Sequence, residues 1–123
     1  MMSPTINLSD LVILIADSSS YVRMISQSML RGFGANKVLE VGHTTGLLQT
    51  LSSQKVDMLL CDVRLPPHGG LVLTRTIRRN ADNVNRTMPI LLMSSDTREM
   101  TIKSARDAGA NMVIAKPMSP KNL

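Results

Sequence analysis

Residues 56–70 read VDMLLCDVRLPPHGG. An apolar run fills the first part of this stretch, Asp62 ends the run, and a loop rich in Pro and Gly follows. Short apolar runs bounded by turn residues are typical of buried strands. Asp62 is therefore predicted at the carboxyl end of a strand, where open α/β sheets place their binding and catalytic groups.

Three other polar residues close apolar runs elsewhere in the chain: Asp17, Ser94 and Lys116. Because parallel strands present their carboxyl ends at one edge of a sheet, we expect these side chains to converge with Asp62. Two acids, a hydroxyl and an amine can together bind a divalent cation and hold a phosphoryl group.

Five short apolar segments punctuate the sequence, and most are continuous rather than alternating, as in strands covered on both faces. They are residues 11–16, 37–41, 56–61, 89–94 and 111–115. Segments with helical spacing separate them. This alternation predicts right-handed βαβ units and a doubly wound α/β fold with a parallel sheet.

Helices are predicted to begin near residues 20, 44, 70 and 96. In the second helix, Leu47, Leu48 and Leu51 form the predicted inner stripe. The fourth is predicted to begin at Asp96, because Glu99 three residues later completes a capping box in carboxylate form.

The length of 123 residues suggests a single domain over residues 1–123, with residues 1–9 as an N-terminal extension. Ser119 and Pro120 suit the first turn of a fifth helix. Only residues 119–123 would belong to this helix, so it would be truncated. Since a parallel sheet needs cover on both faces, we expect the sequence to be part of a longer chain.

Composition argues against several classes of protein. Tyr21 and Phe33 are the only aromatic residues, so a base-stacking platform for single-stranded nucleic acid is excluded. The net charge of +5 comes from mostly scattered Lys and Arg residues. The single cysteine, Cys61, cannot form a disulfide within the chain, and no window approaches the roughly 18 apolar residues of a membrane span. With no signal-peptide pattern either, we expect a cytoplasmic protein.

Asp17 and Asp62 are the candidate ligands of a hard cation such as Mg²⁺, which prefers oxygen ligands and retains several waters. The backbone carbonyl of Arg64, two residues beyond Asp62, is a third candidate. Either aspartate alone could simply form a turn, so only the pair indicates a metal.

Asp62 is also a competent phosphoryl acceptor, because aspartate carboxylates form covalent acyl phosphates. Lys116 could pair with the charge of the transferred group, and Ser94 could donate a hydrogen bond to it. Each has a plainer alternative: Lys116 could be a surface loop residue, and Ser94 could satisfy the backbone at a strand end. The ordered set of four favours the functional interpretation.

The motifs IADS (residues 15–18), DVRLPPHGG (62–70), LLMSS (91–95) and KP (116–117) resemble the receiver domain of two-component response regulators, the CheY-like family. The resemblance runs from about residue 10 to the C-terminus. It implies a flavodoxin-like sheet of five parallel strands in the order 2-1-3-4-5.

The resemblance also implies roles for the site residues. Asp62 would accept a phosphoryl group from a sensor histidine kinase or phosphotransfer protein, and Asp17 would coordinate Mg²⁺. Ser94 would be the switch hydroxyl, Lys116 the ionic partner of the phosphoryl group, and the Lys116–Pro117 bond would be cis. The resemblance implies that the protein is a signalling switch rather than an enzyme. It would act on a downstream output domain or protein, without membrane or direct nucleic-acid binding, and could form a homodimer.

Three positions depart from the family pattern. Ala16 replaces the first of two acids at the end of the first strand, which should weaken Mg²⁺ binding. Val113 replaces an aromatic residue on the last strand, so loop movement after Ser94 would convey the switch. Arg64 and Asp96 could pair over the site and slow hydrolysis of an acyl phosphate, or remain solvated.

Two rival functions remain open from the sequence. The loss of the acid at Ala16 could leave a degenerate receiver, which would act as a phosphorylation-independent interaction module. A flavin- or nucleotide-binding protein could share the same fold, since fold alone does not decide function. Without a metal, Asp17 would repel the phosphate of a flavin or nucleotide, and the scarcity of aromatic residues removes the usual ring-stacking partners.

Overall fold

A computed structural model of the chain describes residues 8–116. These residues form one sheet of five parallel strands in the order β2-β1-β3-β4-β5, as predicted. A short 3₁₀ turn, Leu8–Asp10, precedes the first strand. The strands are β1 (Val12–Ala16), β2 (Lys37–Val41), β3 (Met58–Asp62), β4 (Ile90–Ser94) and β5 (Met112–Ala115). The helices are α1 (Ser20–Gly32), α2 (Thr44–Ser53), α3 (Gly70–Arg79) and α4 (Glu99–Ala108).

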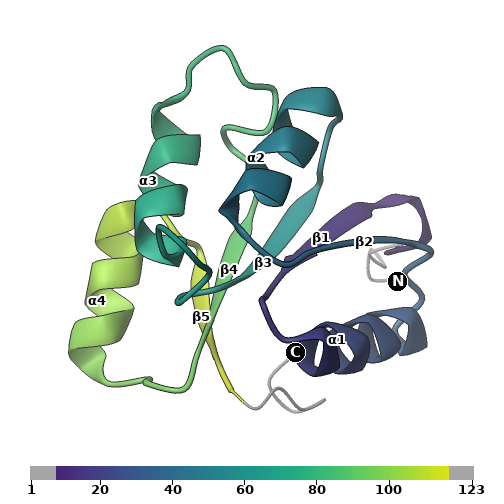
Figure 1. The fold of residues 1–123 in the computed structure, drawn as a ribbon, viewed down its shortest axis with the longest axis horizontal. Coiled ribbons are helices and arrows are strands. Elements are labelled where there is room, and N and C mark those ends of the chain that lie inside the picture. Colours follow the sequence, from purple (N-terminus) through teal and green to yellow (C-terminus); the bar gives the residue numbers. More distant parts are fainter. Residues whose placement is uncertain (1–7, 117–123) are drawn as a thin grey trace, which may run out of the picture.

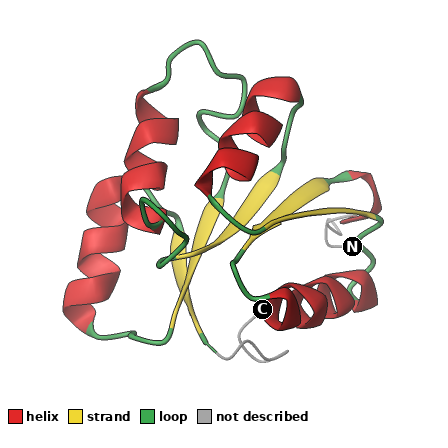
Figure 2. Ribbon diagram, viewed as in Figure 1, coloured by secondary structure: helices red, strands yellow, loops and turns green. Residues whose placement is uncertain are grey.

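The helices cover both faces of the sheet (Figures 1 and 2). One apolar cluster joins alternate residues of β1 and β3 to α1, through Ile13, Ile15, Leu60 and Leu30. The other face packs against the remaining three helices through a larger cluster. Its members include Leu14, Leu59, Leu92, Leu47, Leu73 and Ala105. Apolar side chains on both faces explain why the strands read as continuous apolar runs.

Some boundaries differ from the predictions. Strand β3 includes Asp62 but begins at Met58, because the Val56 N–H donates instead to Oδ1 of buried Asn85, at 2.7 Å. Leu48 is exposed, whereas Leu47 and Leu51 are buried. The predicted fifth helix and the Lys116–Pro117 bond fall outside the described residues.

Helix α4 begins at Glu99 rather than at Asp96. The Asp96 carboxylate accepts a hydrogen bond from the Arg98 N–H at 3.0 Å, and its ion pair with the Arg98 guanidinium measures 2.8 Å. These bonds form a local turn that delays the helix, so the predicted capping box is wrong. Gly109 ends the helix with φ near 108°, in the left-handed region that suits glycine.

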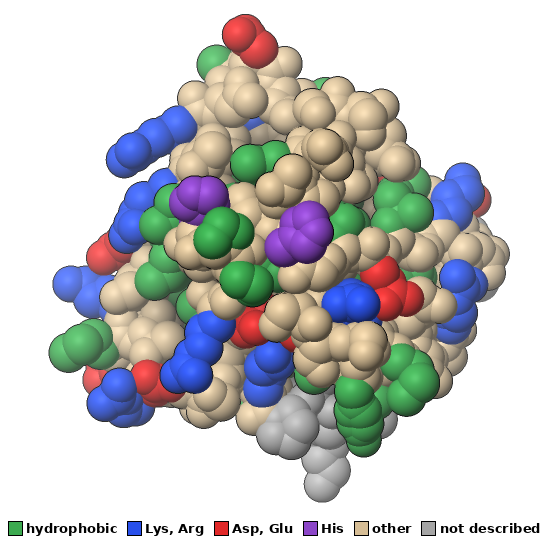
Figure 3. Space-filling model, in the orientation of Figure 1, with side chains coloured by type: hydrophobic (Ala, Val, Ile, Leu, Met, Phe, Trp, Pro, Cys, Tyr) green, Lys and Arg blue, Asp and Glu red, His purple; other side chains and the backbone are tan. Residues whose placement is uncertain are grey.

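Two surface properties of residues 8–116 bear on membrane and nucleic-acid partners: the apolar length of the helices and the distribution of charge on the face that Figure 3 shows. Within residues 8–116, no helix is long and apolar enough to cross a bilayer. Lys and Arg side chains occur on both sides and near the centre of the face shown in Figure 3, in keeping with a scattered positive charge.

Candidate functional site

The strand register brings the predicted side chains to one edge of the sheet. Ala16 of β1 pairs with Cys61 of β3, so Asp17 and Asp62 lie at neighbouring strand ends. Asp62 pairs with Met93, and the Lys116 N–H donates to the Ser94 carbonyl at 2.8 Å. These four polar residues therefore sit around the carboxyl ends of the central strands.

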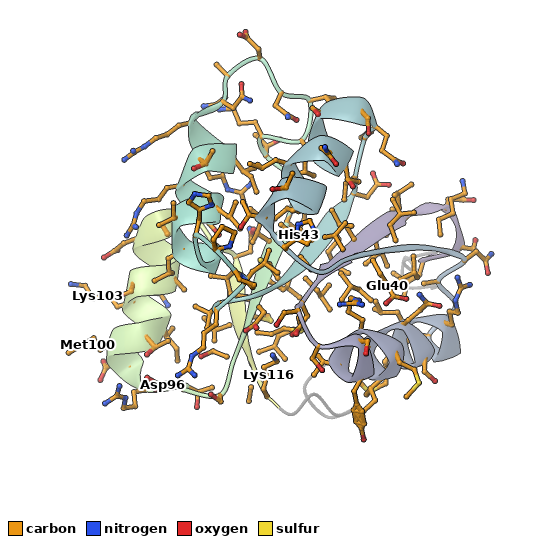
Figure 4. The ribbon with its side chains drawn as sticks, viewed as in Figure 1. Glu40, His43, Asp96, Met100, Lys103 and Lys116 are labelled. Atoms are coloured by element: carbon orange, nitrogen blue, oxygen red, sulfur yellow. The ribbon has the colours of Figure 1, made fainter. Side chains whose placement is uncertain are left out.

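Lys116 joins the two aspartates directly. Its ammonium nitrogen lies 2.7 Å from Asp17 Oδ2 and 3.4 Å from Asp62 Oδ1. The lysine side chain is 20% exposed, whereas those of Asp17 and Asp62 are 1% and 11% exposed. Lys116 thus points inward from the end of β5 rather than into solvent as a surface loop residue would (Figure 4).

Local turns fix both carboxylates. Asp17 Oδ1 accepts a hydrogen bond from the Ser19 N–H at 2.8 Å, and the Ser19 hydroxyl in turn caps α1 at the Val22 N–H. Asp62 Oδ1 accepts from the Arg64 N–H at 3.2 Å. Both patterns are turns in which a strand-end aspartate bonds the backbone two residues on.

The loop after Asp62 is held from two sides. The Gly70 N–H donates to the Val63 carbonyl at 2.8 Å, which connects the start of α3 to the loop after Asp62. The Pro66 carbonyl accepts from both the N–H and the hydroxyl of Thr44, at the start of α2. His68 is exposed in this loop.

Ser94 is 2% exposed, and its hydroxyl bonds to the backbone of the following loop. It donates to the Asp96 carbonyl at 2.9 Å and accepts from the Asp96 N–H at 3.0 Å. The plainer expectation, a strand-end hydroxyl that satisfies the backbone, is therefore realised in this conformation. Asp96 pairs with Arg98 and not with Arg64, so of the two alternatives left open by the sequence, the pair over the site is not formed.

The donor set fits a divalent cation. Asp17 Oδ2 is fully buried and, within residues 8–116, accepts no hydrogen bond apart from its contact with the Lys116 ammonium. No backbone hydrogen bond reaches the Arg64 carbonyl from the described part of the chain. Two carboxylates and a carbonyl, with a cationic group already between the acids, match the oxygen ligands that Mg²⁺ takes together with waters.

Sequence reasoning missed Arg23. The Arg23 guanidinium donates a hydrogen bond to the Asp17 backbone carbonyl from the first turns of α1. A helical arginine near the end of the first strand carries no spacing signal that distinguishes this contact from a solvated side chain.

Comparisons with known proteins agree on the kind of domain. The family model described as response regulator receiver domain matches residues 13–123. The chemotaxis protein CheY of Pseudomonas aeruginosa is 32% identical over 111 residues, which cover 90% of this chain and 88% of that protein.

Two solved structures extend the similarity to the backbone. One, from Chloroflexus aurantiacus and described as a response regulator, is 30% identical with a TM-score of 0.82, over 90% of this chain and 88% of that one. The receiver domain of the sensor histidine kinase PA1611 from Pseudomonas aeruginosa is 26% identical, with a TM-score of 0.77 and the same coverage. That structure carries a magnesium ion in its active-site cleft.

Proposed function

The chain belongs to the response regulator receiver family, and on that basis we propose that it is a phosphoacceptor of a two-component system, with Asp62 as the acceptor. The observation that carries the proposal is the Lys116 ammonium in contact with both Asp17 and Asp62. A strand-end cation facing a carboxylate pair suits the transfer of a dianionic group to one of those carboxylates.

In the proposed reaction, a carboxylate oxygen of Asp62 attacks the phosphorus of a phosphohistidine on a sensor histidine kinase or phosphotransfer protein. The O–P bond forms as the N–P bond breaks, and the histidine nitrogen leaves with the bonding electron pair and regains a proton. Asp62 becomes an acyl phosphate. Lys116 would then pair with the oxygens of the transferred group.

Asp17, Asp62 and the Arg64 carbonyl would hold Mg²⁺. When bound, the ion supplies positive charge that offsets the charge on the equatorial oxygens of the phosphoryl group. The Lys116 ammonium and the Arg64 N–H are the groups of the chain that contact the carboxylate of Asp62.

Ser94 is proposed as the switch. Its hydroxyl would exchange the Asp96 backbone for a phosphoryl oxygen and carry the loop before α4 with it. Such an exchange biases a two-state equilibrium through a local charge, and a downstream output domain or protein would read the altered surface.

A second candidate function has one specific observation in its favour. Ala16 replaces a carboxylate, so the described residues include no cluster of three metal-binding side chains at this edge. If two carboxylates are too few for useful Mg²⁺ affinity, the domain would act as a phosphorylation-independent interaction module.

Intact mass after incubation with acetyl phosphate distinguishes the two functions. We expect the protein to gain one phosphoryl group with Mg²⁺ present and little or none when Mg²⁺ is chelated. The Asp62→Asn variant should gain none. Failure of the wild-type protein to gain mass under any Mg²⁺ concentration would favour the interaction module, and equal gain by Asp62→Asn would rule out Asp62 as the acceptor.

A further inference from the structure

Arg23 connects Asp17 to the neighbouring edge strand. Its Nη1 donates a hydrogen bond to the Asp17 carbonyl, and its Nε lies 3.1 Å from Glu40 Oε1 on β2. The side chain of Glu40, a residue of β2, lies between that strand and α1 in Figure 4, and it also accepts a hydrogen bond from Gln27. The guanidinium thus bridges the backbone of the candidate metal ligand and a carboxylate on the next strand.

This bridge completes the hydrogen bonding of Asp17. The Asp17 N–H donates to the Val41 carbonyl at 3.1 Å, and its Oδ1 accepts from the Ser19 N–H at 2.8 Å. Oδ2 faces Lys116. With the carbonyl held by Arg23, both the peptide and the carboxylate of Asp17 are fixed in direction.

The surroundings leave room for this contact. A Cβ added at Gly42 would lie 3.3 Å from Arg23 Nη1 and 3.9 Å from the Asp17 carbonyl oxygen. The glycine therefore lets the guanidinium pass close to the end of β1. The Arg23 side chain is only 20% exposed, so its hydrogen bonds are partly shielded from water.

We propose that Arg23 is a positioning residue for the cation site, acting through the Asp17 backbone rather than on the ion. This inference rests on the proposed function, because it concerns the same Mg²⁺ site. Ala16 leaves Asp17 as the one carboxylate at the end of β1, so the direction of that single ligand matters more here. Partners that orient a metal ligand typically change metal affinity 10- to 100-fold when they are removed.

The test compares Arg23→Gln with a matched control, Arg31→Gln. Arg31 lies on the same helix, and its contacts are with Gln27 Oε1 and the Asn36 carbonyl. Both variants remove one positive charge, which by Coulomb's law alone should tighten Mg²⁺ binding. If Arg23 positions Asp17, Mg²⁺ binding should instead weaken, and it should do so in Arg23→Gln only.

Titration with Mg²⁺ alone, followed by amide NMR shifts, gives the dissociation constants. We expect Kd to rise about tenfold in Arg23→Gln and to stay level or fall slightly in Arg31→Gln. Arg23→Lys keeps the charge and a hydrogen-bonding group but loses the planar fork that reaches two acceptors at once, so its Kd should fall between those of the wild type and Arg23→Gln.

A second readout needs no metal. The Ser19 N–H bonds Asp17 Oδ1, so its hydrogen exchange should accelerate in metal-free Arg23→Gln. The Ile15 amide in β1 serves as the reference for global opening and should be unchanged.

The possible failures can be told apart. Wild-type Mg²⁺ affinity and unchanged Ser19 exchange in Arg23→Gln would overturn the positioning role and leave the proposed function standing. If Arg23→Gln does not fold, wild-type affinity in Arg23→Lys would overturn the role in the same way. Absence of Mg²⁺ binding by the wild-type protein would overturn the proposed function together with this inference.

Discussion

Among single residues, Cys61 takes no part in the proposed chemistry, but the pKa of its thiol responds to the negative charge at the carboxyl edge of the sheet. Burial, followed by the negative charges of Asp62 and Asp17, raises the pKa of the Cys61 thiol from 9.0 to about 12. Cys61 is a free cysteine buried in the core. The thiolate would be the unfavourable form beside two carboxylates.

This shift predicts a loss of stability in alkali. Between pH 9 and 12 the unfolded chain releases the Cys61 proton while the folded chain retains it, so the free energy of unfolding falls as pH rises. The slope from this group approaches about 1.4 kcal/mol per pH unit. Urea unfolding at pH 8, 9 and 10 should show a steeper decline for the wild type than for Cys61→Ala. An equal decline of the free energy of unfolding in the two proteins would contradict the raised pKa of Cys61.

At the scale of elements, the start of α3 is packed tightly against the loop after Asp62. A Cβ added at Gly70 would lie 2.8 Å from the Asp62 carbonyl oxygen and 3.0 Å from both the Val63 Cα and the Leu92 Cδ2. Two of these neighbours are backbone atoms and cannot move without displacing the loop. The glycine therefore lets the helix begin directly beside the candidate acceptor.

We expect Gly70→Ala to destabilise the fold by about 1–3 kcal/mol, the usual range for overpacking. Gly32→Ala is the matched control, since no atom lies within 4 Å of a Cβ at that helix end. The control should be neutral or stabilising by up to about 1 kcal/mol. Equal stability of the two variants, measured by urea unfolding, would show that the contact at Gly70 is easily relieved.

The elements that the sequence predicted well are those with strong apolar patterns. All five strands appear, and four of them end where expected, because each apolar run is followed directly by polar or turn residues. The start of α4 was mispredicted because the choice between a capping box and a local Asp96–Arg98 turn depends on side-chain geometry. Strand order followed from the family resemblance rather than from the apolar pattern.

For the whole molecule, the parallel topology is what brings distant residues together. Asp17, Asp62, Ser94 and Lys116 come from the ends of four strands, and the sequence predicted their convergence from that placement alone. It could not predict the direction of the Ser94 hydroxyl, which depends on the conformation of the following loop, or the Arg23 contact, which depends on how α1 packs beside β1 and β2.

The most direct measurement is a crystal structure of the protein with Mg²⁺ and beryllium trifluoride, which mimics a phosphoryl group. We predict the trifluoride on a carboxylate oxygen of Asp62, the ion between Asp17, Asp62 and the Arg64 carbonyl, and the Lys116 ammonium against a fluoride. The Ser94 hydroxyl should have left the Asp96 backbone for the trifluoride. Crystals grown with saturating ligand in which Asp62 carries no adduct, or in which Lys116 faces solvent, would contradict the account.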